Sequence, residues 1–165
     1  MEQKDDPARL SEETSTASGK KPDMKYRHLA IFAATIAVLP FGQNASAQDA
    51  DAGEKVFKKC MTCHRIGEGA KNAVGPEQNG IVGRQAGTVP GFAYSPLNKA
   101  AGEAGLVWNE ETIFAYLPDP NAFLKDFLTK QGKPELAKGS TKMAFKLPSE
   151  QERKDVIAYL KKFSK

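Results

Sequence analysis

The chain has 165 residues, of which 40% are hydrophobic and 27% are charged, and its net charge is +4 with a pI near 9.0. This composition is typical of one folded domain and excludes a largely disordered or membrane-embedded chain. The lysines are not gathered into a tract of the kind that binds nucleic acid, and two cysteines three positions apart cannot build a disulfide framework.

The first 47 residues have the features of a targeting sequence. Residues 24–47 contain a basic cluster, the apolar run 29–41 and the small residues 45–47, which together predict a secretory signal peptide. The apolar run is well short of the roughly 20 residues that cross a bilayer as a helix, so a cleaved signal is favoured over an uncleaved anchor. Residues 1–23 are polar, and they indicate either a start site assigned too early or a disordered leader. The functional domain is therefore predicted to span 48–165 and to reside in the periplasm.

The first predicted helix covers residues 52–64, where Gly53, Phe57 and Cys60 fall on one side. Residues 67–91 are rich in glycine and proline and predict a long irregular loop. A loop of this length is expected to pack around another part of the structure.

Shorter helices are predicted over residues 95–104 and 110–117, the second capped by Asn109. Another begins at Asp119-Pro120, where proline suits the first helical position. We expect its apolar stripe to pack over the lower edge of a cofactor rather than to form a partner-binding arm; the stripe comprises Phe123, Leu124, Phe127 and Leu128.

The last helix follows Ser149, which with Glu152 predicts a capping box. Its apolar face is made by Val156, Tyr159, Leu160 and Phe163. Since Gly53 permits a close approach, the first helix is the expected packing partner. No strand pattern occurs along the chain, so the fold class is all-α.

The pentapeptide 60–64 has the pattern Cys-x-x-Cys-His, which predicts covalent attachment of one haem c. The thiols of Cys60 and Cys63 can add to the two vinyl groups of one porphyrin, and His64 is then held beneath the iron. A thioredoxin-like dithiol would open a helix after a strand, and a zinc site would need four ligands. Neither alternative fits this pair as well.

A second iron ligand can be sought by elimination. His64 is the only histidine after the signal peptide, and Met61 is tied into the attachment loop. Met143 is then the remaining methionine of the domain, although a lone methionine in a loop usually serves packing. Thioether ligation opposite histidine raises the reduction potential and closes the iron to small ligands, which suits electron transfer.

These residues resemble class I cytochrome c, and most closely its bacterial cytochrome c2 branch, near the mitochondrial type. The resemblance covers about residues 53–163, and beyond the haem motif it rests on Gly75-Pro76, 80–84, 90–95, Asn98-Lys99, Trp108, Tyr116-Leu117, 141–145 and 155–162. It implies an all-α fold in which the N- and C-terminal helices cross over the haem. The segment 121–140 is longer than in the short family members.

The resemblance also implies individual roles. The Pro76 carbonyl would accept a hydrogen bond from His64. A buried haem propionate would be reached by Tyr94 and Trp108, with Arg84 nearby. A polar network beside Met143 would comprise Asn98, Tyr116 and Thr141, with Phe145 at the cofactor as well. Trp108 and Tyr116 can equally be core aromatics.

The resemblance implies a monomeric one-electron carrier that is not an enzyme. It would shuttle electrons between membrane complexes such as a bc1-type complex, a terminal oxidase or a photosynthetic reaction centre, docking at the membrane surface without spanning it. The alternative is a haem enzyme or gas-binding protein with an open iron. Five lysines are expected to form a rim that meets acidic docking surfaces, namely Lys58, Lys59, Lys71, Lys142 and Lys146, while the acids Glu110, Glu111, Glu150, Glu152 and Asp155 are expected to lie away from it.

Overall fold

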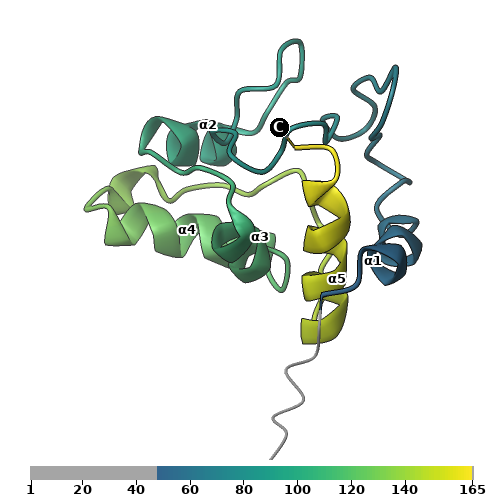
Figure 1. Ribbon diagram of the computed structural model, residues 1–165. Coiled ribbons are helices and arrows are strands. Elements are labelled where there is room, and N and C mark those ends of the chain that lie inside the picture. Colours follow the sequence, from purple (N-terminus) through teal and green to yellow (C-terminus); the bar gives the residue numbers. More distant parts are fainter. Residues whose placement is uncertain (1–47, 165) are drawn as a thin grey trace, which may run out of the picture. The chain divides into compact units, whose positions relative to one another are not determined.

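The computed structural model describes residues 48–164, and predictions for residues 1–47 lie outside them. The helices are α1 (Ala50–Phe57), α2 (Pro96–Glu103), α3 (Glu110–Tyr116), α4 (Pro120–Lys130), the short 3-10 helix η1 (Pro134–Leu136) and α5 (Glu150–Lys161), joined by irregular loops (Figure 1). In this part of the chain the only paired extended backbone is an isolated bridge between Gln85 and Val107. The all-α fold class and the irregular loop over 67–91 are therefore confirmed.

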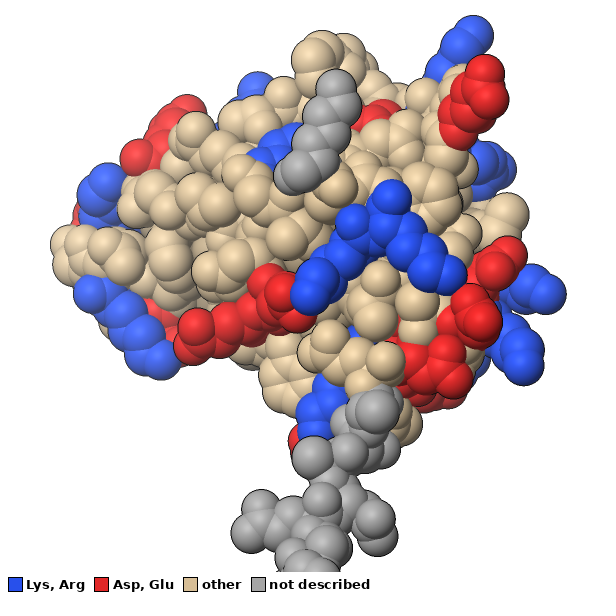
Figure 2. All heavy atoms as spheres, viewed as in Figure 1, with Lys and Arg blue, Asp and Glu red and all other residues tan. Residues whose placement is uncertain are grey.

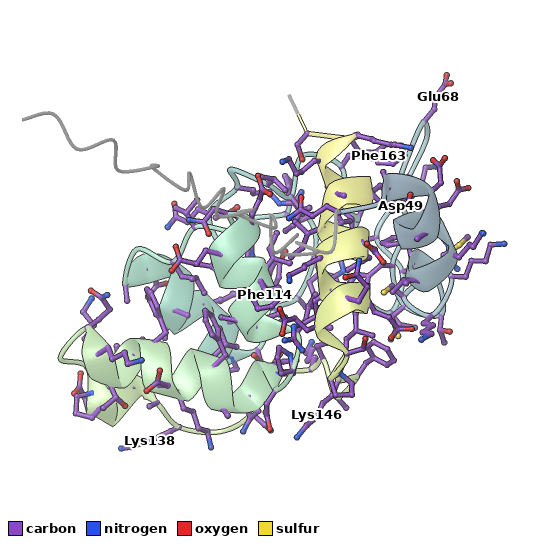
Figure 3. The ribbon with its side chains drawn as sticks, turned by 60° about the horizontal axis from the view of Figure 1, so that its bottom comes forward. Asp49, Glu68, Phe114, Lys138, Lys146 and Phe163 are labelled. Atoms are coloured by element: carbon purple, nitrogen blue, oxygen red, sulfur yellow. The ribbon has the colours of Figure 1, made fainter. Side chains whose placement is uncertain are left out.

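Helices α1 and α5 come from opposite ends of the domain and pack side by side (Figure 1). A Cβ atom at Gly53 would lie 1.9 Å from the backbone oxygen of Asp155, so glycine alone permits this approach. The rings of Phe57 and Tyr159 are 5.4 Å apart, and the Asp49 backbone N–H donates to the Asp155 carboxylate at 3.0 Å. Figure 3 shows Asp49 beside α5. The predicted pairing of the two helices is confirmed.

The first helix begins at Ala50, two residues before the predicted start, after its N-cap Asp49. It is shorter than predicted because it ends at Phe57 rather than at His64. Beyond Phe57 the chain continues in tight turns. The Cys60 backbone N–H donates to the Phe57 carbonyl at 2.8 Å, and the Cys63 backbone N–H donates to the Cys60 carbonyl at 3.0 Å. The residues that directly follow Phe57 include neither glycine nor proline, so the sequence does not mark the end of the helix there. The haem motif consequently lies on turns and not on a helix.

Helices α2, α3, α4 and α5 begin after side-chain caps at Ser95, Asn109, Asp119 and Ser149. The predicted starts after Asn109, Asp119 and Ser149 are confirmed, whereas Ser95 was predicted as part of a helix and is instead the cap of α2. Each side-chain oxygen accepts a hydrogen bond from a backbone N–H of the first turn and so satisfies a group that would otherwise lack a partner. The predicted capping box at Ser149 is incomplete. The carboxylate of Glu152, which the box would use, pairs with Lys59 at 2.5 Å instead.

The stripe on α4 is core, but it does not cover a cofactor edge as predicted. Leu124 and Leu128 are fully buried, and Phe123 and Phe127 pack against the core cluster. The helix contacts α2, α3 and η1, and none of the four stripe residues lines the cavity described below. Helix α4 therefore supports the cavity wall from behind.

Replacing Leu124 with alanine should destabilise the protein, because the side chain is fully buried and its truncation removes apolar contacts and leaves a cavity. We expect a loss of about 2–5 kcal/mol in the free energy of unfolding, measured by guanidinium titration of the haem-loaded protein. Asp126→Ala on the same helix is the control, since this carboxylate is exposed and its ion pair is with Lys130. Equal losses in the two variants would contradict the core assignment of α4.

Candidate cofactor site

A cavity of about 310 Å³ opens among side chains from α1, α2, α3, α5 and the intervening loops. Its size falls in the range of about 300–1,000 Å³ that is typical of ligand and cofactor sites. Every predicted site residue lines it: Cys60, Cys63, His64, Pro76, Arg84, Tyr94, Asn98, Trp108, Tyr116, Thr141, Met143 and Phe145. Apolar residues such as Phe57, Ile81 and Leu160 make up much of the remaining wall.

His64 is held with one ring nitrogen fixed. Its Nδ1 lies 2.7 Å from the Pro76 carbonyl oxygen, and because that oxygen can only accept, Nδ1 carries the proton and Nε2 keeps its lone pair. Burial lowers the pKa of His64, which favours this neutral ring. A Cβ atom at Gly75 would lie 2.5 Å from the ring, so glycine is needed beside it. The arrangement leaves an oriented nitrogen donor in the cavity wall.

The two cysteines are half-buried in the same wall and are not joined to each other. Burial raises the pKa of the Cys60 thiol to about 11, so this thiol has little tendency to ionise. A reactive dithiol would need a thiol whose pKa is lowered rather than raised. The local chemistry argues against a thioredoxin-like role for this pair.

Three polar side chains meet beside Met143. Thr141 Oγ1 donates to Asn98 Oδ1 at 2.9 Å and accepts from the Met143 backbone N–H at 3.2 Å. The Tyr116 hydroxyl is hydrogen-bonded to Thr141 and Asn98, and burial raises the pKa of Tyr116. This network ties the backbone at Met143 to α2 and α3.

A second polar corner contains Tyr94, Trp108 and Arg84. The Tyr94 hydroxyl shares a hydrogen bond with the Val89 backbone, and burial raises the pKa of Tyr94. The Arg84 guanidinium pairs with the Glu77 carboxylate at 2.9 Å, and both side chains are largely buried. A positive group, a phenol and an indole thus share one end of the cavity, which suits a carboxylate-bearing ligand.

Sequence reasoning missed two residues that act on the predicted ones. The Gln78 side-chain amide donates to the Pro76 carbonyl at 3.0 Å and lies 2.9 Å from His64 Nδ1. Asn121 Oδ1 accepts from the Thr141 backbone N–H at 3.2 Å. Gln78 lies only two residues after Pro76, and this closeness in sequence is a signal that could have indicated their contact. Nothing in the sequence connects Asn121 with Thr141.

The expected separation of the lysine rim from acidic residues is wrong in part. Lys59 and Lys142 border the cavity, but Lys59 pairs with Glu152 and Lys146 pairs with Asp119, each at 2.5 Å. Figure 2 shows basic and acidic groups interleaved on the face drawn there. Lys138 and Lys146 point outward on the same side of the domain (Figure 3). Ion pairs therefore reduce the charge asymmetry that the sequence predicted.

The donors that face the cavity fit a covalent porphyrin. Two thiols are separated by two residues, an imidazole nitrogen follows directly, and a thioether lies in the same wall. Soft sulfur and imidazole donors suit haem iron, and apolar walls suit the macrocycle. None of the described helices is long and apolar enough to cross a membrane.

Comparison with known proteins agrees with this site. The family model for cytochrome c matches residues 50–164. The chain is 71% identical to cytochrome c2 iso-1 of Rhodospirillum centenum over 119 residues, which are 71% of this chain and 99% of that protein. It is 63% identical to cytochrome c2 of Rhodopseudomonas palustris over 128 residues, covering 78% of this chain and 89% of that one. The solved structure of a cytochrome c2 from R. centenum superposes with a TM-score of 0.70 at 68% identity, covering 71% of this chain and 99% of that one.

The fold and the site define a one-electron carrier with a single covalently attached haem c, and not an enzyme. The chain belongs to the cytochrome c family, in its class I, bacterial cytochrome c2 branch.

Proposed function

We propose that Cys60 and Cys63 bind the haem through thioether bonds and that His64 and Met143 ligate its iron. The observation that carries this proposal is that all four side chains line one cavity. When bound, the haem supplies a one-electron couple that changes oxidation state without bond making or breaking. The Pro76 carbonyl orients His64, and the network of Asn98, Tyr116 and Thr141 holds the backbone beside Met143.

We further propose that the corner of Tyr94, Trp108 and Arg84 receives a haem propionate, with Phe145 covering the cofactor near the cavity mouth. Arg84 supplies positive charge there, although Glu77 already engages its guanidinium. The test is a visible spectrum in both oxidation states, combined with mass analysis of the peptide that contains residues 60–64. We expect a haem mass on that peptide and no reaction of the reduced protein with carbon monoxide. Tight carbon monoxide binding would favour the open-iron alternative.

The domain is proposed to act in the periplasm after removal of residues 24–47 as a signal peptide. The small residues 45–47, which follow the apolar run 29–41 and directly precede Gln48, support a cleavage at this point. Mass analysis of the exported protein should find Gln48 as its first residue. A mature protein that retains residues 29–41 would instead indicate a membrane-anchored carrier.

The partners of the domain are proposed to be bc1-type complexes, terminal oxidases or reaction centres. Acidic faces of these partners would bind the lysines around the cavity mouth. Lys142 borders the cavity and donates to the Ala93 carbonyl. Lys142→Glu should slow association with an acidic redox partner at low salt. The difference from wild type should shrink towards 0.15 M salt, where screening acts over about 8 Å. Stopped-flow rates at several ionic strengths measure this.

The matched control is Lys161→Glu, because Lys161 is an exposed lysine that does not line the cavity and pairs with Glu110. Equal slowing by the two variants, or association that is independent of salt, would contradict docking at the cavity mouth.

A further inference from the structure

The segment 121–140 touches the cavity wall from behind through an aromatic cluster. The Phe123 ring lies 6.4 Å from Trp108 and 5.8 Å from Tyr116, and those two rings are 4.7 Å apart. Trp108 and Tyr116 line the cavity, whereas Phe123 does not. Each ring in this cluster therefore contacts the other two, and Phe123 closes it on the side away from the cavity.

A second contact comes from the same turn of α4. Asn121 accepts from the Thr141 backbone N–H at 3.2 Å, and Thr141 in turn accepts from the Met143 backbone N–H at 3.2 Å. Two hydrogen bonds thus connect α4 to the backbone at Met143. Phe123 contacts the wall at Trp108 and Tyr116 through packing, and Asn121 contacts it at Thr141 through a hydrogen bond.

These contacts matter because tryptophan and tyrosine present one polar atom each, and packing decides where that atom points. A smaller residue in place of Phe123 would leave space behind both rings, and they would then tilt or admit water. Solvent access and hydrogen bonding around a haem tune its reduction potential. Packing behind the wall can therefore act on the cofactor without touching it.

We propose that Phe123 and Asn121 are positioning residues through which α4 fixes the cavity wall at Trp108 and Tyr116 and the backbone at Met143. The proposal rests on the haem role given above, because the potential is measured through the haem. It assigns to the segment 121–140 a function in tuning the site beyond its contribution to the core.

Phe123→Leu tests the packing contact on the haem-loaded protein. We expect a lower reduction potential, because water near the wall stabilises the more highly charged oxidised form. Exchange of the Trp108 indole N–H should also quicken by about tenfold, since two aromatic contacts are lost. Trp108 is the only tryptophan of the chain, so its indole signal is unambiguous by NMR.

Phe127→Leu is the matched control. Phe127 lies one turn further along α4, and its ring contact among the described residues is with Phe123. The control removes the same atoms from the same helix and should leave the potential and the Trp108 exchange rate unchanged. Identical behaviour of the two variants in both measurements would show that Phe123 is ordinary core.

Asn121→Ala tests the polar contact and serves if Phe123→Leu does not fold. Loss of one hydrogen bond should speed exchange of the Thr141 amide by about fivefold, while Asn121→Asp keeps the acceptor and the wild-type rate. An unchanged rate in Asn121→Ala would overturn this part of the proposal. Carbon monoxide binding by the wild-type protein would instead refute Met143 ligation, and exchange at Trp108 and Thr141 would still decide the positioning role.

Discussion

Replacing Met143 with alanine is expected to lower the reduction potential by at least about 100 mV and to open the iron to carbon monoxide. Met143 lies in the cavity wall with its backbone fixed by Thr141, and as the proposed iron ligand its thioether would favour the reduced state over the oxidised one. Axial ligands set haem potentials over roughly 0.8 V, so a change of this size is modest on that scale. Redox titration and the spectrum of the reduced protein under carbon monoxide measure the two effects.

The chain offers a control in its other described methionine. Met61 is half-exposed within the attachment loop and does not line the cavity. Met61→Leu should keep the wild-type potential and the closed iron. If Met143→Ala behaved like Met61→Leu, the proposed ligation would be wrong.

Replacing Gly53 with alanine should destabilise the protein by at least about 3 kcal/mol, the upper part of the usual range for overpacking. The new methyl group would lie 1.9 Å from the Asp155 backbone oxygen, which cannot move without displacing α5. Helix propensity acts in the opposite direction, because alanine in a helix interior is favoured over glycine by roughly 0.5–1 kcal/mol. A net loss therefore identifies the packing contact. Guanidinium titration of the haem-loaded protein measures it.

Glu54→Ala is the control for that experiment, since Glu54 is the next residue of α1 and is exposed. Its effect should stay within about 0.5 kcal/mol. Stabilisation by Gly53→Ala would mean that α1 and α5 do not approach as closely as the structure shows.

Local sequence predicted much of this protein because its strongest signals act over a few residues. The pattern of Cys60, Cys63 and His64 encodes an attachment chemistry that depends on spacing within one turn. Caps such as Asn109 and Asp119 mark helix starts because their side chains bond to the following backbone. Met143 was predicted as a ligand by elimination, which needs only a count of residue types, and the structure places it in the cavity wall. These features do not depend on how distant segments pack.

Only the tertiary structure decided the features that depend on partners far apart in the chain. The sequence does not show that α1 ends at Phe57, that Glu152 pairs with Lys59 instead of capping α5, or that α4 lies behind the cavity wall. The contact of Asn121 with Thr141 likewise joins residues with no common motif. The type of a residue determines which hydrogen bonds and ion pairs its side chain can make. The folded chain decides which partner it meets, because packing brings together groups whose separation in sequence carries no information about their separation in space.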